Sequence, residues 1–488
     1  MAVIDVENLF ERGAAWPPEQ ERPRFNRYRD NRALFEGRQE GVYRDWIRTI
    51  RSDLNASLEI YLNFQRRLSL LWADLLLGEP PGFAAGDPGS PEQTHLDRLV
   101  TENDLRNELY EVAIDVSRYG DGLIGARYDG SRAYVEARNP RFWIPVLDPL
   151  NGKRISAHVF GVVVPSGVQR ILVAEIHEPG QITTRRYTMD EDGTVIRDLI
   201  DEQITRTGLD LILVSQASNV TTTDTALGQD DYADLDPIMQ EIDIRLAQIA
   251  KILDKHSDPN MSGPESALEY DPDTGSYRFR GGGRFFPVGP GETPPQYVVW
   301  DGSLENAFRE LESLTQWLYV ISETSPAAFG QIQQGLAESG SALRRLMMAP
   351  LAHVNRLRTR ITPAIENVLV AAAGLERMAG RPDSPGFDSV SIQWQDGLPR
   401  DETEVTTLVV QKKVAGLIST TQALRELYPD KDEDEIQALA DEAAEQTPSA
   451  PAGPGERNAP IQIQTSIGEP TEREEEAEEA AEAAQPGI

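Results

Sequence analysis

Apolar residues recur at spacings of three and four along several long stretches of this chain, a pattern typical of amphipathic helices. The first stretch lies within residues 28–80, where Gly78 and two prolines end it. Residues 231–256 begin with aspartates and finish with lysines and a histidine, which favour the two ends of a helix. They predict one helix of about 26 residues, or about 39 Å. Further long helices are predicted for residues 304–323 and 342–374.

A helix-start signature follows a glycine-rich link. Ser90 suits the N-cap position and Pro91 the first helical position. Gln93 falls where its side chain would complete a capping box with Ser90. We expect this helix to continue as far as Gly120.

Between residues 123 and 214 the apolar period shortens to two, which predicts strands. Pairs of aspartate and glycine at residues 129–130 and 192–193 provide turns between them. The predicted strands are 123–128, 133–137, 159–164, 171–177 and 183–189. Because strands and helices fall in separate blocks, we predict an α+β fold with antiparallel sheet.

Two segments interrupt the long helices. Residues 257–303 are rich in glycine and proline and predict a small β insertion. Its short strands are expected at 276–280, 284–288 and 296–300. Residues 325–341 predict a long polar loop, and loops of that length are usually functional. Three short helices are then predicted at 402–414, 420–428 and 432–445, with Gly416 ending the first.

The net charge of −33 argues against a protein that binds nucleic acid tightly through clustered lysine and arginine. Part of it lies near the C-terminus, where residues 431–488 hold 16 acidic and 3 basic residues. Within this region, residues 447–488 contain too little apolar surface to fold alone, so we predict a disordered acidic tail. A transient helix in its alanine- and glutamate-rich run is the alternative. The rest of the chain is also acidic.

The chain has no cysteine, which excludes disulfides, zinc–thiolate sites and thiol nucleophiles. Its first residues lack the features of a signal peptide, and its apolar runs are too short to span a bilayer. We therefore expect a soluble protein made inside the cell, without a membrane partner. With 488 residues it has room for about three domains.

Catalytic and cofactor motifs are mostly absent. Residues 120–125 match G-x-G-x-x-G, but here the motif is predicted to leave a helix and open a strand, the reverse of a dinucleotide site. No P-loop sequence occurs, and the five histidines lack metal-ligand spacing. Four aspartates offer carboxylates for magnesium, although capping of a helix start is the commoner reason for such a cluster; they are Asp230, Asp231, Asp234 and Asp236. We expect no enzyme, no cofactor and no metal site.

Several short sequence segments resemble the portal proteins of tailed double-stranded-DNA bacteriophages, which connect the head to the tail. These strings are residues 26–37, 139–141, 339–344 and 416–419. The order of helix, β insertion, helix, loop and helix strengthens the resemblance. It implies a fold with wing, stem, clip and crown, assembled as a dodecameric ring around a DNA channel.

The resemblance assigns each zone a part. The implied parts are a wing (1–230), a stem helix (231–256), a clip (257–303), a second stem helix (304–324), a tunnel loop (325–341), a long helix and return to the wing (342–400), a crown (401–446) and the acidic tail (447–488). Prolines 350 and 363 should kink the long helix because each removes a backbone donor.

Two groups of residues become candidates for contact with partners. The loop next to DNA would include Gln331, Gln333, Gln334, Glu338, Ser339, Arg344 and Arg345. Both arginines would touch phosphate or pair with acidic residues of a neighbouring subunit. The clip surface would include Tyr277, Arg278, Arg280, Arg284, Phe285 and Phe286.

A portal would work at one vertex of the virion capsid after assembly in the host cytoplasm. The implied partners are further copies of the chain, double-stranded DNA, the terminase large subunit, head–tail adaptors, and major capsid and scaffolding proteins. An acidic conduit suits this role, since each phosphate contact would hinder sliding. The alternatives are another ring-forming adaptor or scaffold protein and, last, a nucleic-acid-processing enzyme.

Overall fold

The computed structural model divides the chain into two compact units, residues 1–401 and 402–488. The residues that it describes are 5–43, 60–167, 169–257, 261–262, 268–272, 275–279, 291, 296–297, 304–331, 340–395, 402–428, 431 and 433–446. Helices and antiparallel sheets both occur, so the predicted α+β class is confirmed. None of the helices within these residues has the length and apolar character of a membrane span.

The main core of the first unit lies between helices and a three-stranded antiparallel sheet with strand order β3-β2-β9. The strands are β2 (Asp121–Tyr128), β3 (Ala133–Arg138) and β9 (Val214–Ser218). The helices packed around them are α2 (Arg22–Phe35), α4 (Phe64–Leu77), α5 (Pro91–Glu102), α6 (Leu105–Tyr119) and α10 (Met348–Ala379). A short antiparallel pair, β1 (Gly82–Ala84) with β14 (Ser391–Gln393), joins segments about 300 residues apart.

A five-stranded antiparallel sheet holds a second core and runs in the order β4-β5-β6-β7-β8. Its strands are β4 (Trp143–Asp148, after η2, Pro140–Phe142), β5 (Asn151–Ser166), β6 (Gln169–Glu178), β7 (Gln181–Met189) and β8 (Ile196–Arg206). The N-terminal segment packs on it, with α1 (Val6–Leu9) and η1 (Glu19–Glu21). The five strands predicted from periodicity are confirmed as β2, β3, β5, β6 and β7, whereas β4, β8 and β9 were not predicted.

The single helix predicted from Ser90 to Gly120 is two helices, α5 and α6. Asp104 adopts φ +47° between them, a conformation that a continuous helix does not allow. Ser90 caps α5 as predicted, because its hydroxyl accepts a hydrogen bond from the Gln93 N–H at 3.1 Å. The reciprocal bond is not made. The Gln93 side chain instead bonds the backbone of residues 83 and 85, which ties α5 to β1.

The G-x-G-x-x-G string leaves α6 and enters β2, as predicted. Gly120 ends the helix with φ +82°, and a Cβ at this position would lie 2.3 Å from the carbonyl oxygen of Gly228. A Cβ at Gly122 would lie 2.7 Å from the carbonyl oxygen of Val112. The glycines therefore allow close backbone packing at a helix-to-strand turn.

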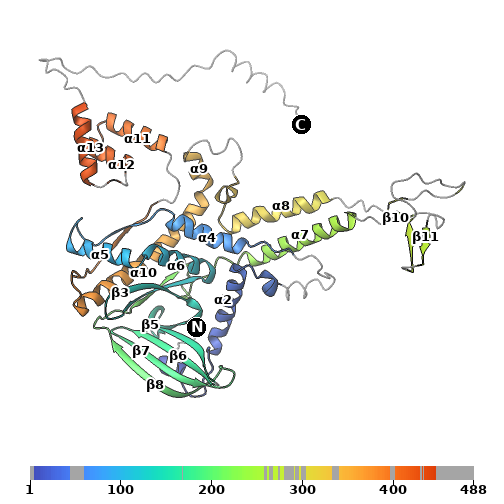
Figure 1. The fold of residues 1–488 in the computed structure, drawn as a ribbon, viewed down its shortest axis with the longest axis horizontal. Helices are drawn as coiled ribbons and strands as arrows, with labels where there is room; N and C mark the ends of the chain where they lie inside the picture. Colours follow the sequence, from blue (N-terminus) through green and yellow to red (C-terminus); the bar gives the residue numbers. More distant parts are fainter. Residues whose placement is uncertain are drawn as a thin grey trace, which may run out of the picture. The chain divides into compact units, whose positions relative to one another are not determined.

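Two long helices, α7 (Asp236–Ser257) and α8 (Leu304–Ile321), lie side by side (Figure 1). Arg245 of α7 joins them through an ion pair of 2.7 Å with Glu310 of α8. The predicted start of the first helix at Asp231 is wrong: residues 231–235 form turns, and α7 begins at Asp236. Pro237 suits the first turn of a helix because its missing N–H would have no partner there.

The insertion between α7 and α8 contains two short antiparallel pairs within its described residues. They are β10 (Met261–Ser262) with β13 (Gln296–Tyr297), and β11 (Leu268–Asp271) with β12 (Ser276–Phe279). The described residues of the predicted strands at 276–280 and 296–300 do form strands, as β12 and β13. The predicted strand at 284–288 lies outside the described residues.

The long helix predicted from residue 342 is two helices, α9 (Gly340–Leu346) and α10. Pro350 lacks the N–H that would bond the carbonyl of Leu346, and the helix is interrupted at this turn. At Pro363 the helix continues, and α10 ends at Ala379 rather than near residue 374.

The second unit contains the three predicted helices, α11 (Glu402–Val414), α12 (Thr420–Leu427) and α13 (Glu433–Gln446). Gly416 ends α11 with φ +71°, as predicted. Buried residues from all three helices form its interior; they are Val409, Ala423, Ile436 and Ala440.

Candidate functional site

The segment predicted as an open polar loop begins with a fixed turn. Residues Pro326–Phe329 form the 3-10 helix η4, which Ser325 caps by accepting the Ala328 N–H at 3.3 Å. The ring of Phe329 packs against Phe64, with centroids 5.4 Å apart. The first residues of the loop predicted at 325–341 therefore form a fixed turn, because an aromatic contact anchors this turn to α4.

Just before this turn, Glu323 holds an uncommon backbone conformation, with φ +54°. Its carboxylate lies 2.8 Å from Nδ1 of His353 on α10 and also pairs with Arg356. The hydrogen bond from His353 lowers the pKa of Glu323. These contacts connect the end of α8 to the first turns of α10.

His353 is buried in a second set of contacts. Its ring stacks on Trp72 of α4, with centroids 4.0 Å apart. Its Nε2 lies 3.9 Å from an oxygen of Asp231, just before α7. Asp231 accepts a hydrogen bond from Asn219 at 2.6 Å, and burial raises its pKa. His353 thus links α10 to α4, to the segment before α7 and, through Glu323, to the end of α8.

The start of α7 is fixed by one arginine. Arg27 of α2 donates to Asp230 at 2.7 Å and to Asp236 at 2.5 Å. Tyr43 donates to the other oxygen of Asp236 at 3.0 Å. Burial raises the pKa of Asp236 although Arg27 is close. Removal of Arg27 would leave two carboxylates near each other with no cation between them.

We call this set of side chains the helix joint. It consists of Arg27, Trp72, Asp230, Asp231, Asp236, Glu323, His353 and Arg356. It fixes where α7 begins, where α8 ends and where α10 begins. The arrangement can hold two long helices and the turn η4 after α8 in a set geometry. It positions structural elements and offers no paired nucleophile and base.

The structure corrects the interpretation of the four aspartates. Asp230 and Asp236 are ion-paired with Arg27, and Asp231 is close to His353, so capping and solvation alone do not explain these three. Asp234 is exposed, as solvation predicts. Among the residues that the structure describes, no group of three or more His, Asp or Glu could hold a metal ion. Sequence reasoning missed the role of Arg27 and His353, because their partners lie about 200 and 120 residues away.

Few of the predicted contact residues are described with their side chains. Gln331, Arg344 and Arg345 are exposed, the two arginines on α9. Tyr277 and Arg278 lie on β12, opposite Tyr270 and Glu269. The others lie outside the described residues; they are Gln333, Gln334, Glu338, Ser339, Arg280, Arg284, Phe285 and Phe286.

The contacts of the helix joint predict that replacing His353 destabilises the protein. Replacement by alanine removes the stack on Trp72 and the bond to Glu323 and leaves a cavity. We expect the free energy of unfolding to fall by about 2–4 kcal/mol in a denaturant titration. The matched control is Arg356→Ala, which loses a half-exposed ion pair with Glu323 and a 3.4 Å contact with His353, and should cost about 1 kcal/mol or less. Equal losses for the two variants would contradict the assignment.

A second prediction concerns Asp243, which is buried on α7 and accepts the Leu62 N–H at 3.1 Å. Burial raises the pKa of Asp243 to about 7, above its value of about 3.9 in an unfolded chain. The folded state therefore holds a proton that the unfolded state releases, and this group costs stability as pH rises from about 4 to about 7.

Asp243→Asn keeps the acceptor for Leu62 but cannot ionise. We expect the variant to gain on the order of 1–3 kcal/mol over the parent at pH 8 and to gain little at pH 4. Thermal unfolding at the two pH values measures this difference. Asp234→Asn, at an exposed site on the same segment, is the control. A gain of equal size at both pH values would refute the ionisation argument.

Comparison with known proteins gives the following matches. Residues 309–449 match the family model of phage portal proteins described as SPP1 Gp6-like. This segment runs from within α8 through η4, α9 and α10 to the three helices of the second unit. No curated protein matches the chain in sequence.

Two solved structures are similar over 75% of this chain and 89% of their own, each with a TM-score of 0.45. One is described as the virion of a native gene transfer agent (GTA) particle, at 13% identity. The other is described as the neck of an empty GTA particle computed with C6 symmetry, at 14% identity. The family match includes two of the four strings on which the resemblance was based, residues 339–344 and 416–419. The resemblance of this chain to the phage portal proteins is thereby confirmed.

Proposed function

We propose that this chain is the subunit of a phage portal, a closed ring of about twelve copies at one capsid vertex. The ring would be the conduit through which double-stranded DNA enters during packaging and leaves during ejection. Its role would be structural rather than enzymatic. The match of residues 309–449 to the portal family carries the proposal.

The surface of α8 supports ring formation. Trp317 and Val320 are 60% and 65% exposed, and Ile321 beside them is 42% exposed. These residues lie three and four positions apart on one side of the helix, while Leu318 is buried. Such a contiguous exposed apolar strip marks an interaction site. In a head-to-tail ring each subunit buries two different faces, and this strip would be one of them.

The zones would act as the resemblance implies. The α7–α8 pair would be the stem, residues 257–303 the clip that meets the terminase and later the adaptors, and residues 325–341 the tunnel loop. The second unit would be the crown inside the capsid, where scaffolding and capsid proteins assemble. Arg344 and Arg345 would lie near DNA at the end of the tunnel loop. Residues 1–230 would form the wing.

The test is the mass of the purified chain by light scattering, with negative-stain images of the same peak. We expect a ring of about a dozen copies with a central hole. A chain that stays monomeric with and without co-expressed scaffold and capsid proteins would refute the proposal.

A further inference from the structure

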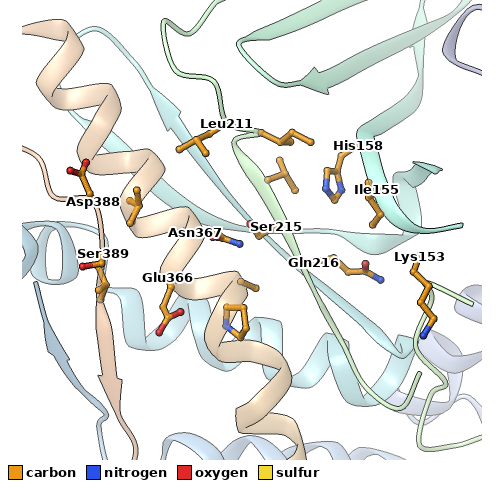
Figure 2. A pocket seen from close by; sticks show the side chains of 16 residues that line it. Lys153, Ile155, His158, Leu211, Ser215, Gln216, Glu366, Asn367, Asp388 and Ser389 are labelled. Atoms are coloured by element: carbon orange, nitrogen blue, oxygen red, sulfur yellow. The ribbon is translucent and has the colours of Figure 1, made fainter. Parts of the chain in front are cut away.

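A hollow of about 650 Å³ lies between α10, β5 and β9 (Figure 2). Lys153 lies on the β5 side of this hollow, whereas Glu366 and Asp388 lie on the α10 side. The rest of the lining is partly apolar and includes Ile155 and Val370. Because its charges have both signs, the hollow favours no single class of ligand. Charges of one sign gather instead at each end of another feature, the pair of helices α4 and α6.

Helices α4 and α6 run antiparallel along each other. The hydroxyls of Ser69 and Ser117 lie 2.9 Å apart. The Tyr110 hydroxyl donates to Asp74 at 2.7 Å. The start of α4 therefore lies beside the end of α6, and the end of α4 lies beside the start of α6. In Figure 1, α2 lies next to the first of these two ends and α5 lies next to the second.

We call the end beside α2 the basic end, after its six arginines: Arg32, Arg38, Arg66, Arg67, Arg118 and Arg141. The guanidinium carbons of Arg66 and Arg118 lie 5.7 and 5.1 Å from the centre of the Phe35 ring. Burial and the nearby positive charges of Arg32 and Arg118 lower the pKa of Arg141. These arginines are therefore close enough to repel one another.

Only part of this positive charge is balanced within the subunit. Glu36 pairs with Arg32 and Arg38. Asp115 pairs with Arg118. In the part of the chain that the structure describes, no ion pair reaches the other three arginines, Arg66, Arg67 and Arg141. The basic end therefore keeps an excess of positive charge, although the net charge of the whole chain is −33.

The end beside α5 is acidic. We call it the acidic end; it consists of Asp74, Asp104, Glu108 and Glu111. Glu108 is half-buried, and the other three are exposed. Burial raises the pKa of Glu108, as do the nearby charges of Glu111 and Glu136, although its carboxylate accepts the Ala137 N–H at 2.6 Å. These carboxylates, too, are close enough to repel one another.

The arginines near the acidic end have other partners. Arg106 donates to backbone carbonyls at the end of α4. Arg127 and Arg138 pair with Glu136. Among the described residues, no ion pair includes any of the four carboxylates of the acidic end.

Interactions within each helix do not explain this distribution of charge. A helix favours acidic side chains near its start and basic ones near its end. Helix α6 follows this rule, with Glu108 in its first turn and Arg118 in its last. Helix α4 has the reverse order, with Arg66 and Arg67 in its first turn and Asp74 nearer its end. Both helices thus carry charge in the same direction in space, although for α4 this direction is unfavourable.

We propose that the basic end of one subunit contacts the acidic end of the next subunit in the ring. The contact rests on the closed ring of the proposed function, in which each copy joins two different faces. The two ends suit this geometry, since they are separated by the 15 residues of α6, or about 22 Å. Copies of so acidic a chain repel one another, and a positive face set against a negative one reduces that repulsion.

The arginines at the basic end already bind carboxylates in the subunit, as the pairs of Glu36 and Asp115 show. A guanidinium can hold a carboxylate through two parallel N–H bonds, so carboxylates of a neighbour suit the remaining arginines. Nucleic acid suits them less, because its phosphates would also approach the acidic surface around them. A second copy of this chain is therefore the partner that the charges favour.

An exchange of charge between two variants tests the contact. Arg141→Glu reverses one charge at the basic end, and Glu111→Arg reverses one at the acidic end. For each variant alone, we expect the concentration at which half of the rings dissociate to rise at least tenfold, in light scattering at about 0.1 M salt. In an equimolar mixture the two variants can alternate around the ring, so that every interface again joins opposite charges. We expect the mixture to dissociate at close to the parent concentration.

Arg197→Glu, on the exposed strand β8, is the control, because it makes the same change of charge outside both ends. It should leave dissociation unchanged. A parent ring with unchanged dissociation in both variants would overturn the contact and leave the proposed function standing. Weakened rings that do not recover in the mixture would also overturn it, since misfolding explains such a loss. A parent that forms no ring would overturn both proposals.

Duplex DNA is the competing partner of the basic end. A short duplex measures it directly, by comparison of the parent with Arg141→Glu at the same salt concentration. We expect equal binding by the two proteins. Loss of DNA binding in Arg141→Glu, with unchanged dissociation of its rings, would assign the basic end to phosphate and overturn the proposal.

Discussion

Replacing Glu376 by alanine should lower the free energy of unfolding of the first unit by about 3–5 kcal/mol, since it leaves buried partners without their acceptor. Glu376 is fully buried near the end of α10. Its two carboxylate oxygens receive His95 Nε2 at 2.9 Å, Arg98 at 2.9 Å, the Ala133 N–H at 2.9 Å, and bonds from Arg381 and Ser384. It therefore joins α5, β3 and the segment after α10.

The electrostatics of this group agree with that role. Burial alone would raise the pKa of Glu376, but the bonds from His95, Ala133 and Arg381 outweigh it and hold the pKa below its usual range. A carboxyl group of lowered pKa contributes stability above its unfolded pKa of about 4.3 and loses it as pH falls further. The parent should therefore lose stability below about pH 4 more steeply than the variant does.

Chemical denaturation at pH 7 and at pH 3.5 measures both effects. Glu376→Gln distinguishes the effect of the lost charge from that of the lost side-chain volume, because glutamine keeps the volume but cannot form the ion pairs with Arg98 and Arg381. The control is Arg377→Ala, which removes an exposed ion pair next to the site and should change stability by about 0.5 kcal/mol or less. A loss below about 1 kcal/mol for Glu376→Ala would mean that the network does not stabilise the fold.

A glutamate at Trp317 or Val320 should convert the proposed ring into single chains. Both side chains are mostly exposed in the subunit, so neither change should harm its folding. In a ring the new carboxylate would be buried against an apolar surface of the neighbour, where an unpaired charge costs several kcal/mol. That cost is repeated at every interface of the ring.

Light scattering measures the outcome as a fall in mass from about a dozen copies to one. Gln316→Glu is the matched control, because it adds the same charge at an exposed polar position of the same helix. It should leave the mass unchanged. A full ring from Trp317→Glu would show that this strip of α8 faces something other than a neighbouring subunit.

Local patterns predicted the parts of the fold that local chemistry decides. The alternation of β2, β3, β5, β6 and β7, with turns of aspartate and glycine, was sufficient for those strands. The break at Asp104 was harder, because apolar spacing continues across it while the backbone leaves the helical region. The break at Met347 lies beside Pro350, where the sequence predicted a kink rather than two helices. The strand β9 was missed because its partner β2 lies about 90 residues earlier, and periodicity carries no information about distant pairing.

The contacts of the helix joint could not be predicted from the sequence for the same reason. Asp231 and Asp236 drew attention from sequence, but only the fold shows that Arg27 and His353 are placed beside them. Likewise, the polar composition of residues 325–341 predicted a loop, and the contact of Phe329 with Phe64 fixes its first turn. The composition of a segment indicates its average exposure, but it does not show that one aromatic side chain, here Phe329, packs against the core.

The position of Glu376 has a consequence for synthesis on the ribosome. The bonds that close the first unit join residue 95 to residues 376 and 386, and β1 to β14, across nearly 300 residues. At about 5–20 residues per second, the early helices and strands wait roughly 15–60 s before α10 and β14 emerge. During that time the apolar surfaces that α10 will cover, and the Ala133 N–H of β3 that awaits Glu376, remain without partners. Nascent chains should therefore depend on chaperones most while residues 100–390 are being made, and slower translation of α10 should increase aggregation more than slower translation of the second unit.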